Sequence, residues 1–361
     1  MGVDRNRKVI LAGNRVRVLV VDDSVVIRRL VSNVLEEDPE IEVVGAAANG
    51  AIALAQIPHK NPDVITLDVE MPEMDGLETL RRIKKEYPEI RVVMFSTLTE
   101  RGAAVTFEAL ALGADDYVAK AANVGSLHVS MAKLKGELIP KVKQFFFFPR
   151  TAAPEPRPSA APAPAIRRRA LPPEAVVIGV STGGPNALGA IVPVFPADFP
   201  LPVLLVQHMP PVFTGLLAER LQAAANLRVK EGEAGEPVEA GTVYIAPGDY
   251  HMEVERRRGQ PVIRLHQGPP ENSCRPAVDV LFRSAERVYG GAVVAVVLTG
   301  MGEDGRRGAE VLKSRGAYVI AQDENTSVVW GMPGAVVRAG LADAVLPLDQ
   351  VVPEILKRVR R

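Results

Sequence analysis

The sequence is almost devoid of cysteine, since Cys274 is the only one among 361 residues. An intrachain disulfide is therefore impossible, and a metal centre built from several thiolates is excluded. With no second thiol to pair with, Cys274 is expected to have a structural role. A chain without disulfides suits a reducing compartment, so we expect a cytoplasmic protein.

Long apolar runs and an excess of charge are also missing. No segment approaches the roughly 18 consecutive apolar residues of a transmembrane helix, so no membrane insertion is expected. The first residues, MGVDRNRKVILAG, hold too short an apolar run for the core of a signal peptide. Lys plus Arg and Asp plus Glu are equal at 43 each, which gives no bulk attraction for nucleic acid and predicts no such partner.

The sequence does contain a segment rich in proline and alanine between two stretches of ordinary globular composition. Residues 149–173 hold eight prolines and seven alanines among 25 residues. Such a segment buries little surface and favours the extended polyproline II conformation. We therefore divide the chain into a first domain at 15–140, a linker at 141–173 and a second domain at 174–358.

Four consecutive phenylalanines, Phe145–Phe148, stand at the start of that linker. Because a helix turns about 100° per residue, four neighbouring side chains cannot all face one core. We expect another surface to cover some of them. Packing between the two domains is the first interpretation, and self-association or lipid contact is the alternative.

Apolar runs alternate with helical patterns on both sides of the linker, as in proteins with parallel sheets and crossover helices. In the first domain the expected strands are VRVLVVD, IEVVGAA, DVITLD, RVVMFS and DYVA. In the second they are AVVIGV, PVLLVQH, GTVYIAP, AVVAVVLTG and AYVIAQ, with YHMEVE and PVIRLH as the arms of a β-hairpin. The pattern predicts an α/β protein with two doubly wound parallel sheets.

Acidic, hydroxyl and basic side chains follow four of the expected strands in the first domain. They are Asp22 and Asp23 after the first strand, Asp68 after the third, Ser96 after the fourth and Lys120 after the fifth. Ligands of open α/β sheets bind at the carboxyl ends of strands, so these side chains should converge. Three converging carboxylates repel one another unless a divalent cation lies among them, and oxygen ligands suit Mg²⁺. A carboxylate beside Mg²⁺ can form an acyl phosphate, whose oxygens a lysine and a hydroxyl could hold.

This set of strand ends, together with the stretch DVEMPEMDG, resembles the receiver domain of response regulators. The resemblance implies a flavodoxin-like fold in which Asp68 is the phospho-acceptor. Asp22 and Asp23 would join it in the Mg²⁺ site. The resemblance further implies that Ser96 is the switch hydroxyl, that Lys120 binds the phosphate and that a chemotaxis histidine kinase is the phosphodonor.

The resemblance extends over residues 16 to about 140, with one departure. The family usually has a proline after the lysine, often following a cis bond, and this chain has Ala121. A cis bond before alanine would cost about 3 kcal/mol. We therefore expect either a trans bond with a shifted loop or a strained bond held by its surroundings.

The second domain opens with GVSTGG, in which Ser181 lies in a glycine-rich turn between an expected strand and an expected helix. The stretch matches G-x-S-x-G, the turn that exposes a nucleophilic serine above the sheet of α/β-hydrolases. Such a turn could instead cradle a phosphate, although both the dinucleotide-binding glycine pattern and a Walker lysine are missing. The match alone leaves both interpretations open.

A serine nucleophile needs a base, and His208 ends the next expected strand 27 residues later. The base in turn needs an acid that fixes its tautomer. Asp304 lies in LTGMGEDG after a buried-looking strand, with Glu303 as its competitor. The order Ser, His, Asp differs from the Ser, Asp, His order of α/β-hydrolases, so an ordinary member of that class is not expected.

The set GVSTGG, QHMP and LTGMGEDG, with YIAPGDYHMEV and RPAVDVLF, resembles the catalytic domain of chemotaxis protein-glutamate methylesterases over residues 174 to about 358. The resemblance implies a Rossmann-like hydrolase that needs no cofactor. Its substrates would be methyl-accepting chemoreceptors, from whose glutamates it releases methanol and whose glutamines it also deamidates. Ser181 would be the nucleophile, His208 the general base and Asp304 the orienting residue. The backbone amides of Met301 and His208 are candidates for the oxyanion hole.

A receiver joined to a hydrolase suggests that the first controls the second. We expect the unphosphorylated receiver to block the Ser181 site and phosphorylation of Asp68 to relieve the block. A phosphorylation-gated transcription factor is one alternative, but the neutral second domain with about five strands lacks a basic reading face. A binding protein with an inactive triad is another, although all three triad residues are present.

Overall fold

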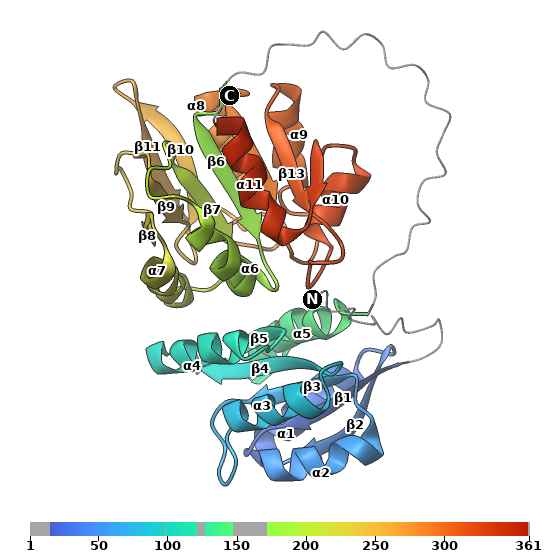
Figure 1. The fold of residues 1–361 in the computed structure, drawn as a ribbon. Coiled ribbons are helices and arrows are strands. Elements are labelled where there is room, and N and C mark those ends of the chain that lie inside the picture. The colour runs from blue at the N-terminus through green and yellow to red at the C-terminus, as the bar shows by residue number, and fades with distance from the viewer. Residues whose placement is uncertain (1–14, 98, 121–126, 147–171, 360–361) are drawn as a thin grey trace, which may run out of the picture. The chain divides into compact units, whose positions relative to one another are not determined.

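The computed structural model describes residues 15–97, 99–120, 127–146 and 172–359, with only the backbone described for 127–133. The chain divides into two compact units, Met1–Phe148 and Pro149–Arg361. Each unit is described by itself (Figure 1). None of the helices in the described ranges is long and apolar enough to cross a membrane.

The first unit alternates five strands with five helices. The strands are β1 (Val16–Val21), β2 (Ile41–Ala47), β3 (Val64–Asp68), β4 (Arg91–Thr97) and β5 (Asp116–Lys120). The helices are α1 (Val25–Glu36), α2 (Gly50–Lys60), α3 (Gly76–Glu86), α4 (Glu100–Ala111) and α5 (Leu127–Lys143).

The five strands form one parallel sheet in the order β2-β1-β3-β4-β5. Helices α1 and α5 contact each other, and α2, α3 and α4 form a second group of neighbours. The two groups cover opposite faces of the sheet, which explains why β3 is buried along its whole length. The strand order reverses between β1 and β3, so their carboxyl ends flank the crevice where ligands bind in such sheets.

Four helices of this unit begin at a polar residue that caps them. The side chains of these residues accept a hydrogen bond from the backbone amide three residues later, and they are Ser24, Asn49, Asp75 and Thr99. Each cap satisfies one of the amides that a helix leaves without a partner in its first turn. The caps therefore fix where the chain leaves each crossover loop.

The second unit contains a larger parallel sheet and a separate hairpin. The sheet strands are β6 (Ala175–Val180), β7 (Val203–Gln207), β8 (Arg228–Glu231), β9 (Thr242–Ile245), β12 (Val293–Val297), β13 (Tyr318–Gln322) and β14 (Ala344–Leu346). The antiparallel hairpin consists of β10 (His251–Arg257) and β11 (Gln260–His266). The helices are α6 (Gly184–Ile191), the 3₁₀ turn η1 (Val192–Val194), α7 (Phe213–Ala224), α8 (Val278–Tyr289), α9 (Arg306–Ser314), α10 (Met332–Arg338) and α11 (Leu348–Val359).

The seven strands follow the order β14-β13-β12-β6-β7-β9-β8, with every neighbouring pair parallel. Helices α8, α9 and α10 form one group of neighbours, and α7, α6 and α11 form another, as a doubly wound sheet requires. The hairpin packs on α8 through β10. The strand order reverses between β6 and β12, and β7 lies on the other side of β6. The carboxyl ends of these three strands therefore share one edge of the sheet.

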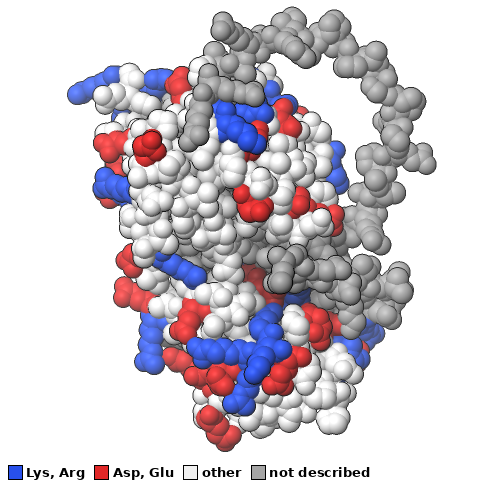
Figure 2. Space-filling view, in the orientation of Figure 1, with Lys and Arg blue, Asp and Glu red and all other residues white. Residues whose placement is uncertain are grey.

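The fold class predicted from the sequence, two doubly wound parallel sheets and one hairpin, is confirmed. The sequence did not indicate β8 and β14, which are short strands at the two edges of the larger sheet. Figure 2 shows basic and acidic side chains intermingled on the visible surface of the first unit, and a broad part of the second with few charges. Most of the predicted linker lies outside the described residues, which stop at residue 146 and resume at residue 172. Ala121 also lies outside the described residues.

Phe145 belongs to the core of the first unit. Its ring is buried, packs edge-on against Phe146 with 6.3 Å between centroids, and lies 5.5 Å from the guanidinium of Arg91. Phe145 therefore has partners from its own unit, and the prediction for the run of four, that another surface covers some of these rings, stays a prediction. Phe147 and Phe148 lie outside the described residues.

Candidate phosphorylation site and candidate active site

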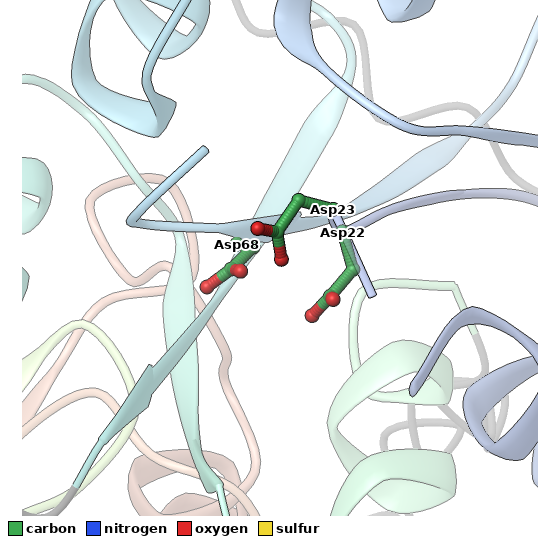
Figure 3. Close-up of side chains that lie close together, drawn as sticks. All are labelled: Asp22, Asp23 and Asp68. Atoms are coloured by element: carbon green, nitrogen blue, oxygen red, sulfur yellow. The ribbon is translucent and has the colours of Figure 1, made fainter. Parts of the chain in front are cut away.

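Three carboxylates meet at the switch point of the first sheet. Asp22 and Asp23 directly follow β1, and Asp68 is the last residue of β3. Each offers one oxygen, and these oxygens all lie within 4.8 Å of one another. Figure 3 shows the three side chains gathered around the ends of the two strands. Asp22 and Asp68 are buried while Asp23 is exposed, so the cluster opens to solvent on one side.

Lys120 supplies a positive charge to this cluster from the end of β5. Its Nζ lies 2.9 Å from Asp22 Oδ2 and 2.8 Å from Asp68 Oδ2. Burial raises the pKa of Asp68 to about 6, although the lysine acts in the opposite direction. One ammonium does not balance three carboxylates. Hard oxygen donors with a remaining negative charge and an open side fit Mg²⁺.

Ser96, the predicted switch hydroxyl, is buried near the end of β4. Its Oγ donates a hydrogen bond of 2.9 Å to the carbonyl of Gly102, which lies in the first turn of α4. The neighbouring strand pairs Ala119 with Ser96, one residue before Lys120. The hydroxyl is therefore close to Lys120 in the sheet but is bonded to the helix.

Ser181 directly follows β6 at the switch point of the second sheet. Its backbone amide donates to Thr299 O at 2.9 Å, and its carbonyl accepts from Gln207 Nε2 at 3.0 Å. These bonds tie the turn to the loop after β12 and to the end of β7. Gly183, the N-cap of α6, has a positive φ of 76°, a conformation that favours glycine. The local sequence thus turns the chain sharply and presents the serine above the sheet.

His208, the residue after β7, is paired with Asp304. The distance between His208 Nε2 and Asp304 Oδ2 is 2.8 Å, and both side chains are largely buried. Glu303, the competing acid, is bonded instead to Arg306 at 3.0 Å and is exposed. Because Asp304 occupies Nε2, the ring nitrogen left to exchange a proton with a serine is Nδ1.

Both oxygens of Asp304 are fully used. Besides His208, they accept hydrogen bonds of 2.7–3.0 Å from the amides of Val278, Asp279 and Gly305 and from the side chain of Asn272. The first two amides belong to the N-terminus of α8, which stabilises an anion. Burial alone would raise the pKa of Asp304, but His208 and the helix amides outweigh it and hold this pKa below its usual range. Asp304 is therefore a permanent carboxylate that orients the histidine.

The protonation of His208 depends on a residue that the sequence did not single out for this role. Burial lowers the pKa of the imidazole, but Cys274 and Asp304 outweigh this effect and raise it to about 10. Among the described residues the Ser181 side chain has no hydrogen bond to His208, a bond that in enzymes often forms only with substrate.

The two candidates for the oxyanion hole differ in whether their backbone amides already donate a hydrogen bond. The amide of His208 donates to Val180 O at 3.2 Å. Within the described ranges the amide of Met301 has no partner, and the side chain of Met301 is partly exposed. Its neighbour Gly300 approaches the nucleophile so closely that a Cβ there would lie 2.7 Å from Ser181 Cβ. The Met301 amide is the better placed of the two.

The loop that carries Met301 is held by a second chain segment. Gly300 forms a parallel bridge with Trp330, and its carbonyl accepts the amides of Gly331 and Met332 at the start of α10. Trp330 in turn donates from Nε1 to Gln322 O at 2.9 Å. The loop after β12 is therefore fixed from both sides next to Ser181.

The fold and the two sites define a class of protein. A receiver-like unit, with a cluster of carboxylates at its switch point, is joined to an α/β unit that has a serine at its switch point and a histidine–aspartate pair at the same sheet edge. Comparison with known families agrees: "CheB methylesterase" matches residues 176–355 and "Response regulator receiver domain" matches residues 18–132. The chain belongs to the CheB methylesterase family.

Relatives and a solved structure extend this agreement over nearly the whole chain. A protein-glutamate methylesterase/protein-glutamine glutaminase of Trichodesmium erythraeum is 49% identical over 95% of this chain and 99% of its own length. A protein of the same name from a Nocardioides strain is 52% identical over 96% of both chains. The crystal structure of the Thermotoga maritima CheB methylesterase catalytic domain covers 52% of this chain and 99% of its own, with 45% identity and a TM-score of 0.51.

Proposed function

We propose that this chain removes methyl esters from glutamate side chains of methyl-accepting chemoreceptors, deamidates receptor glutamines, and is regulated through phosphorylation of Asp68. The names of its relatives support this activity. The single observation that carries it is the His208–Asp304 pair, at 2.8 Å, on the same sheet edge as Ser181.

In the proposed mechanism Ser181 Oγ attacks the ester carbonyl while His208 Nδ1 takes the hydroxyl proton. Nε2–H stays bonded to Asp304, which stabilises the imidazolium. The carbonyl oxygen, now negative, accepts the Met301 amide. The tetrahedral intermediate then collapses, and methoxide leaves with the proton from His208 as methanol. A water, deprotonated by His208, cleaves the acyl-enzyme and restores the serine. With a glutamine the leaving group is ammonia instead.

We propose that Asp22, Asp23 and Asp68 hold Mg²⁺, which when bound offsets the negative charge that the acceptor and the incoming phosphoryl group bring together. An oxygen of Asp68 attacks the phosphorus of a phosphohistidine on a chemotaxis kinase and forms a new P–O bond. The P–N bond breaks, the imidazole of the kinase leaves, and Asp68 becomes an acyl phosphate. Lys120 can pair with the new phosphoryl oxygens. Ser96 reaches them by releasing the Gly102 carbonyl at the start of α4.

The receiver unit is proposed to restrain the esterase until Asp68 is phosphorylated. The proposed division is a receiver at 15–140, a linker at 141–173 and an esterase at 174–358. A release of the Ser96 bond to α4 would couple the acyl phosphate to the helical surface of the receiver. In this proposal, phosphorylation of Asp68 changes the surface at α4, where the receiver can contact other proteins or domains.

The test is methanol release from methylated receptor membranes, measured with and without acetyl phosphate and Mg²⁺. We expect release that rises with the phosphodonor, disappears in Ser181→Ala, and stays at its basal level in Asp68→Asn. Release in wild type that ignores the phosphodonor would contradict the regulation but keep the esterase. Equal release by wild type and Ser181→Ala would contradict the nucleophile.

A further inference from the structure

The proposed nucleophile and base leave the sheet from two neighbouring strands. Val180, the last residue of β6, is paired with Gln207, the last residue of β7. Ser181 and His208 are therefore the first residues beyond these strands. The amide of His208 still donates to the carbonyl of Val180 at 3.2 Å, but among the described residues no backbone bond joins Ser181 to His208. The spacing of the two residues thus depends on contacts made by side chains.

The side chain of Gln207 joins these two residues. Its Nε2 donates a hydrogen bond of 3.0 Å to the carbonyl of Ser181 and one of 3.3 Å to the carbonyl of His208. The orientation of the amide follows from its partners, because a carbonyl accepts from the NH₂ group and not from the amide oxygen. One side-chain amide therefore holds the backbones of the nucleophile and the base together.

The stability of the fold does not explain this glutamine. Gln207 is buried, and among the described residues its Oε1 accepts no hydrogen bond, which destabilises a folded chain. The carbonyl of Ser181 already accepts from the amide of Gly184 at 2.7 Å. The other four residues of β7 are apolar, and a methionine of similar length would complete the strand without burying an oxygen that lacks a partner.

Gly184, the first residue of α6, leaves the space that the amide of Gln207 occupies. A Cβ at this position would lie 1.8 Å from Gln207 Oε1 and 2.8 Å from its Cδ. Any other residue would therefore push the amide away from the two carbonyls. The stretch GVSTGG thus supplies both the nucleophile and the room for the side chain that binds it.

A second buried glutamine holds the same turn from the side of β12 and β13. Gln322 ends β13, and its Oε1 accepts the amide of Thr299 at 2.8 Å. The carbonyl of Thr299 in turn accepts the amide of Ser181 at 2.9 Å. Gln322 uses both ends of its amide, since Nε2 donates to Thr326 at 3.2 Å. Hydrogen bonds account for the burial of this glutamine, in contrast to that of Gln207.

We propose that Gln207 is a positioning residue of the esterase, which fixes the spacing of Ser181 and His208 by binding both carbonyls. The inference rests on the proposed function, because it takes these two residues as nucleophile and base. Gln207 does not contact the reacting atoms in this scheme. A shift of either residue misaligns the transfer of the proton from Ser181 Oγ to His208 Nδ1, which slows the chemical step without weakening the binding of the receptor.

Gln207→Met removes the donor and keeps the approximate length of the side chain. We expect kcat for methanol release by the full chain to fall about tenfold, with KM unchanged. The midpoint of thermal unfolding should stay close to that of wild type, because the oxygen without a partner is lost together with the two hydrogen bonds. A residue that served the fold alone would lower the midpoint and leave the kcat of the folded protein intact.

Gly184→Ala tests the same contact while keeping the glutamine. Its methyl group must displace the amide of Gln207, so we expect a loss of kcat similar to that of Gln207→Met. Gln222→Met is the matched control, since Gln222 lies in α7 and binds the backbone of Leu227 and Val229 near the edge strand β8. We expect this control to keep the kcat of wild type.

The decisive measurement is the rate at which a fluorophosphonate labels Ser181 in the full chain, with Ser181→Ala as the background. This probe needs the nucleophile and its base but no receptor. We expect labelling about tenfold slower in Gln207→Met and Gly184→Ala than in wild type and Gln222→Met. Equal rates in Gln207→Met and wild type would overturn the proposal. Slower labelling of Gln207→Met, in a protein whose wild type releases no methanol, would support Gln207 while contradicting the proposed substrate.

Discussion

At the scale of single residues, the surroundings of His208 favour the protonated imidazole. Asp304 and Cys274 raise its pKa to about 10, against the lowering effect of burial. A protonated imidazole cannot take the Ser181 proton. We therefore expect the esterase to work best at alkaline pH, unless the pKa of His208 falls when substrate binds.

The pH dependence of the esterase follows from this residue. Because the folded pKa lies above the usual value of about 6.5, kcat/KM should still be rising above pH 7, by about tenfold per pH unit below the pKa. Stability changes in the opposite sense, since the charged histidine stabilises the fold fully below pH 6.5 and less as the pH rises toward 10. Methanol release measured from pH 6 to 10 checks the first statement. A plateau already reached at pH 6 would contradict it.

Asp115 carries a stability prediction at the same scale. This buried carboxylate is bonded to Lys84 and Arg91, each at 2.7 Å, and to the amide of Val92 at 3.0 Å. Burial would raise the pKa of Asp115, but the two cations outweigh it and lower the pKa. Its stabilisation is therefore present above the unfolded pKa of about 3.8 and is lost as the pH falls through the folded value.

We expect Asp115→Ala to destabilise the first unit by about 3–5 kcal/mol at pH 7, because it leaves two cations without their buried partner. Urea unfolding at pH 7 and at pH 3 measures the difference, which should shrink at the lower pH. Glu78→Ala is the control, since Glu78 is paired with Arg82 at the surface and should cost less than about 1 kcal/mol. Equal losses in the two variants would contradict the argument from burial.

At the scale of elements, the loop after β12 positions the nucleophile by close packing. A Cβ at Gly300 would lie 2.5 Å from Met332 Sδ and 2.7 Å from Ser181 Cβ. We expect Gly300→Ala to lower kcat at least tenfold and to cost about 1–3 kcal/mol, since Ser181 or α10 must move. Methanol release and thermal unfolding measure the two effects.

Gly189→Ala is the matched control for that substitution. Gly189 lies in α6, where a Cβ meets no atom within 4 Å. The exchange should leave kcat unchanged and stabilise the helix by about 0.5–1 kcal/mol. A loss of activity in both variants would show that the second unit tolerates no added methyl group, and that Gly300 is not special.

The elements predicted correctly from the sequence are those with a regular pattern of apolar residues. Continuous apolar runs identified β1, β3, β6 and β12, because strands buried on both faces of a parallel sheet need apolar residues throughout. The short edge strand RVKE of β8 was missed, since it mixes polar and apolar residues over only four positions. Strand ends then located Asp68 and Ser181 at two switch points, and His208 at the end of the neighbouring strand β7, without any knowledge of loops.

The turn formed by residues 271–275 was not predicted, because loop contacts have no period. It depends on two consecutive left-handed residues and on ion pairs to distant elements. Cys274 was expected to be structural on the ground that it had no second thiol. The stretch ENSCRP, residues 271–276, ends just before α8 and was the only local sign of a turn at this place.

At the scale of the whole molecule, the two units allow a direct test of regulation. We expect residues 170–361 alone to hydrolyse methyl esters faster than the full chain without phosphodonor, and to ignore acetyl phosphate. Methanol release from the two proteins at equal concentration measures the difference. Equal basal rates would contradict the proposed restraint and leave the receiver some other task.

The anchoring of Trp330 gives the molecule a built-in optical reporter. It is the only tryptophan in the chain, and it touches the loop beside the nucleophile while the receiver unit contains none. Intrinsic fluorescence excited at the red edge therefore observes one unit alone, without any label. A change in that emission when acetyl phosphate is added would register, in real time, the arrival of a signal that began at Asp68.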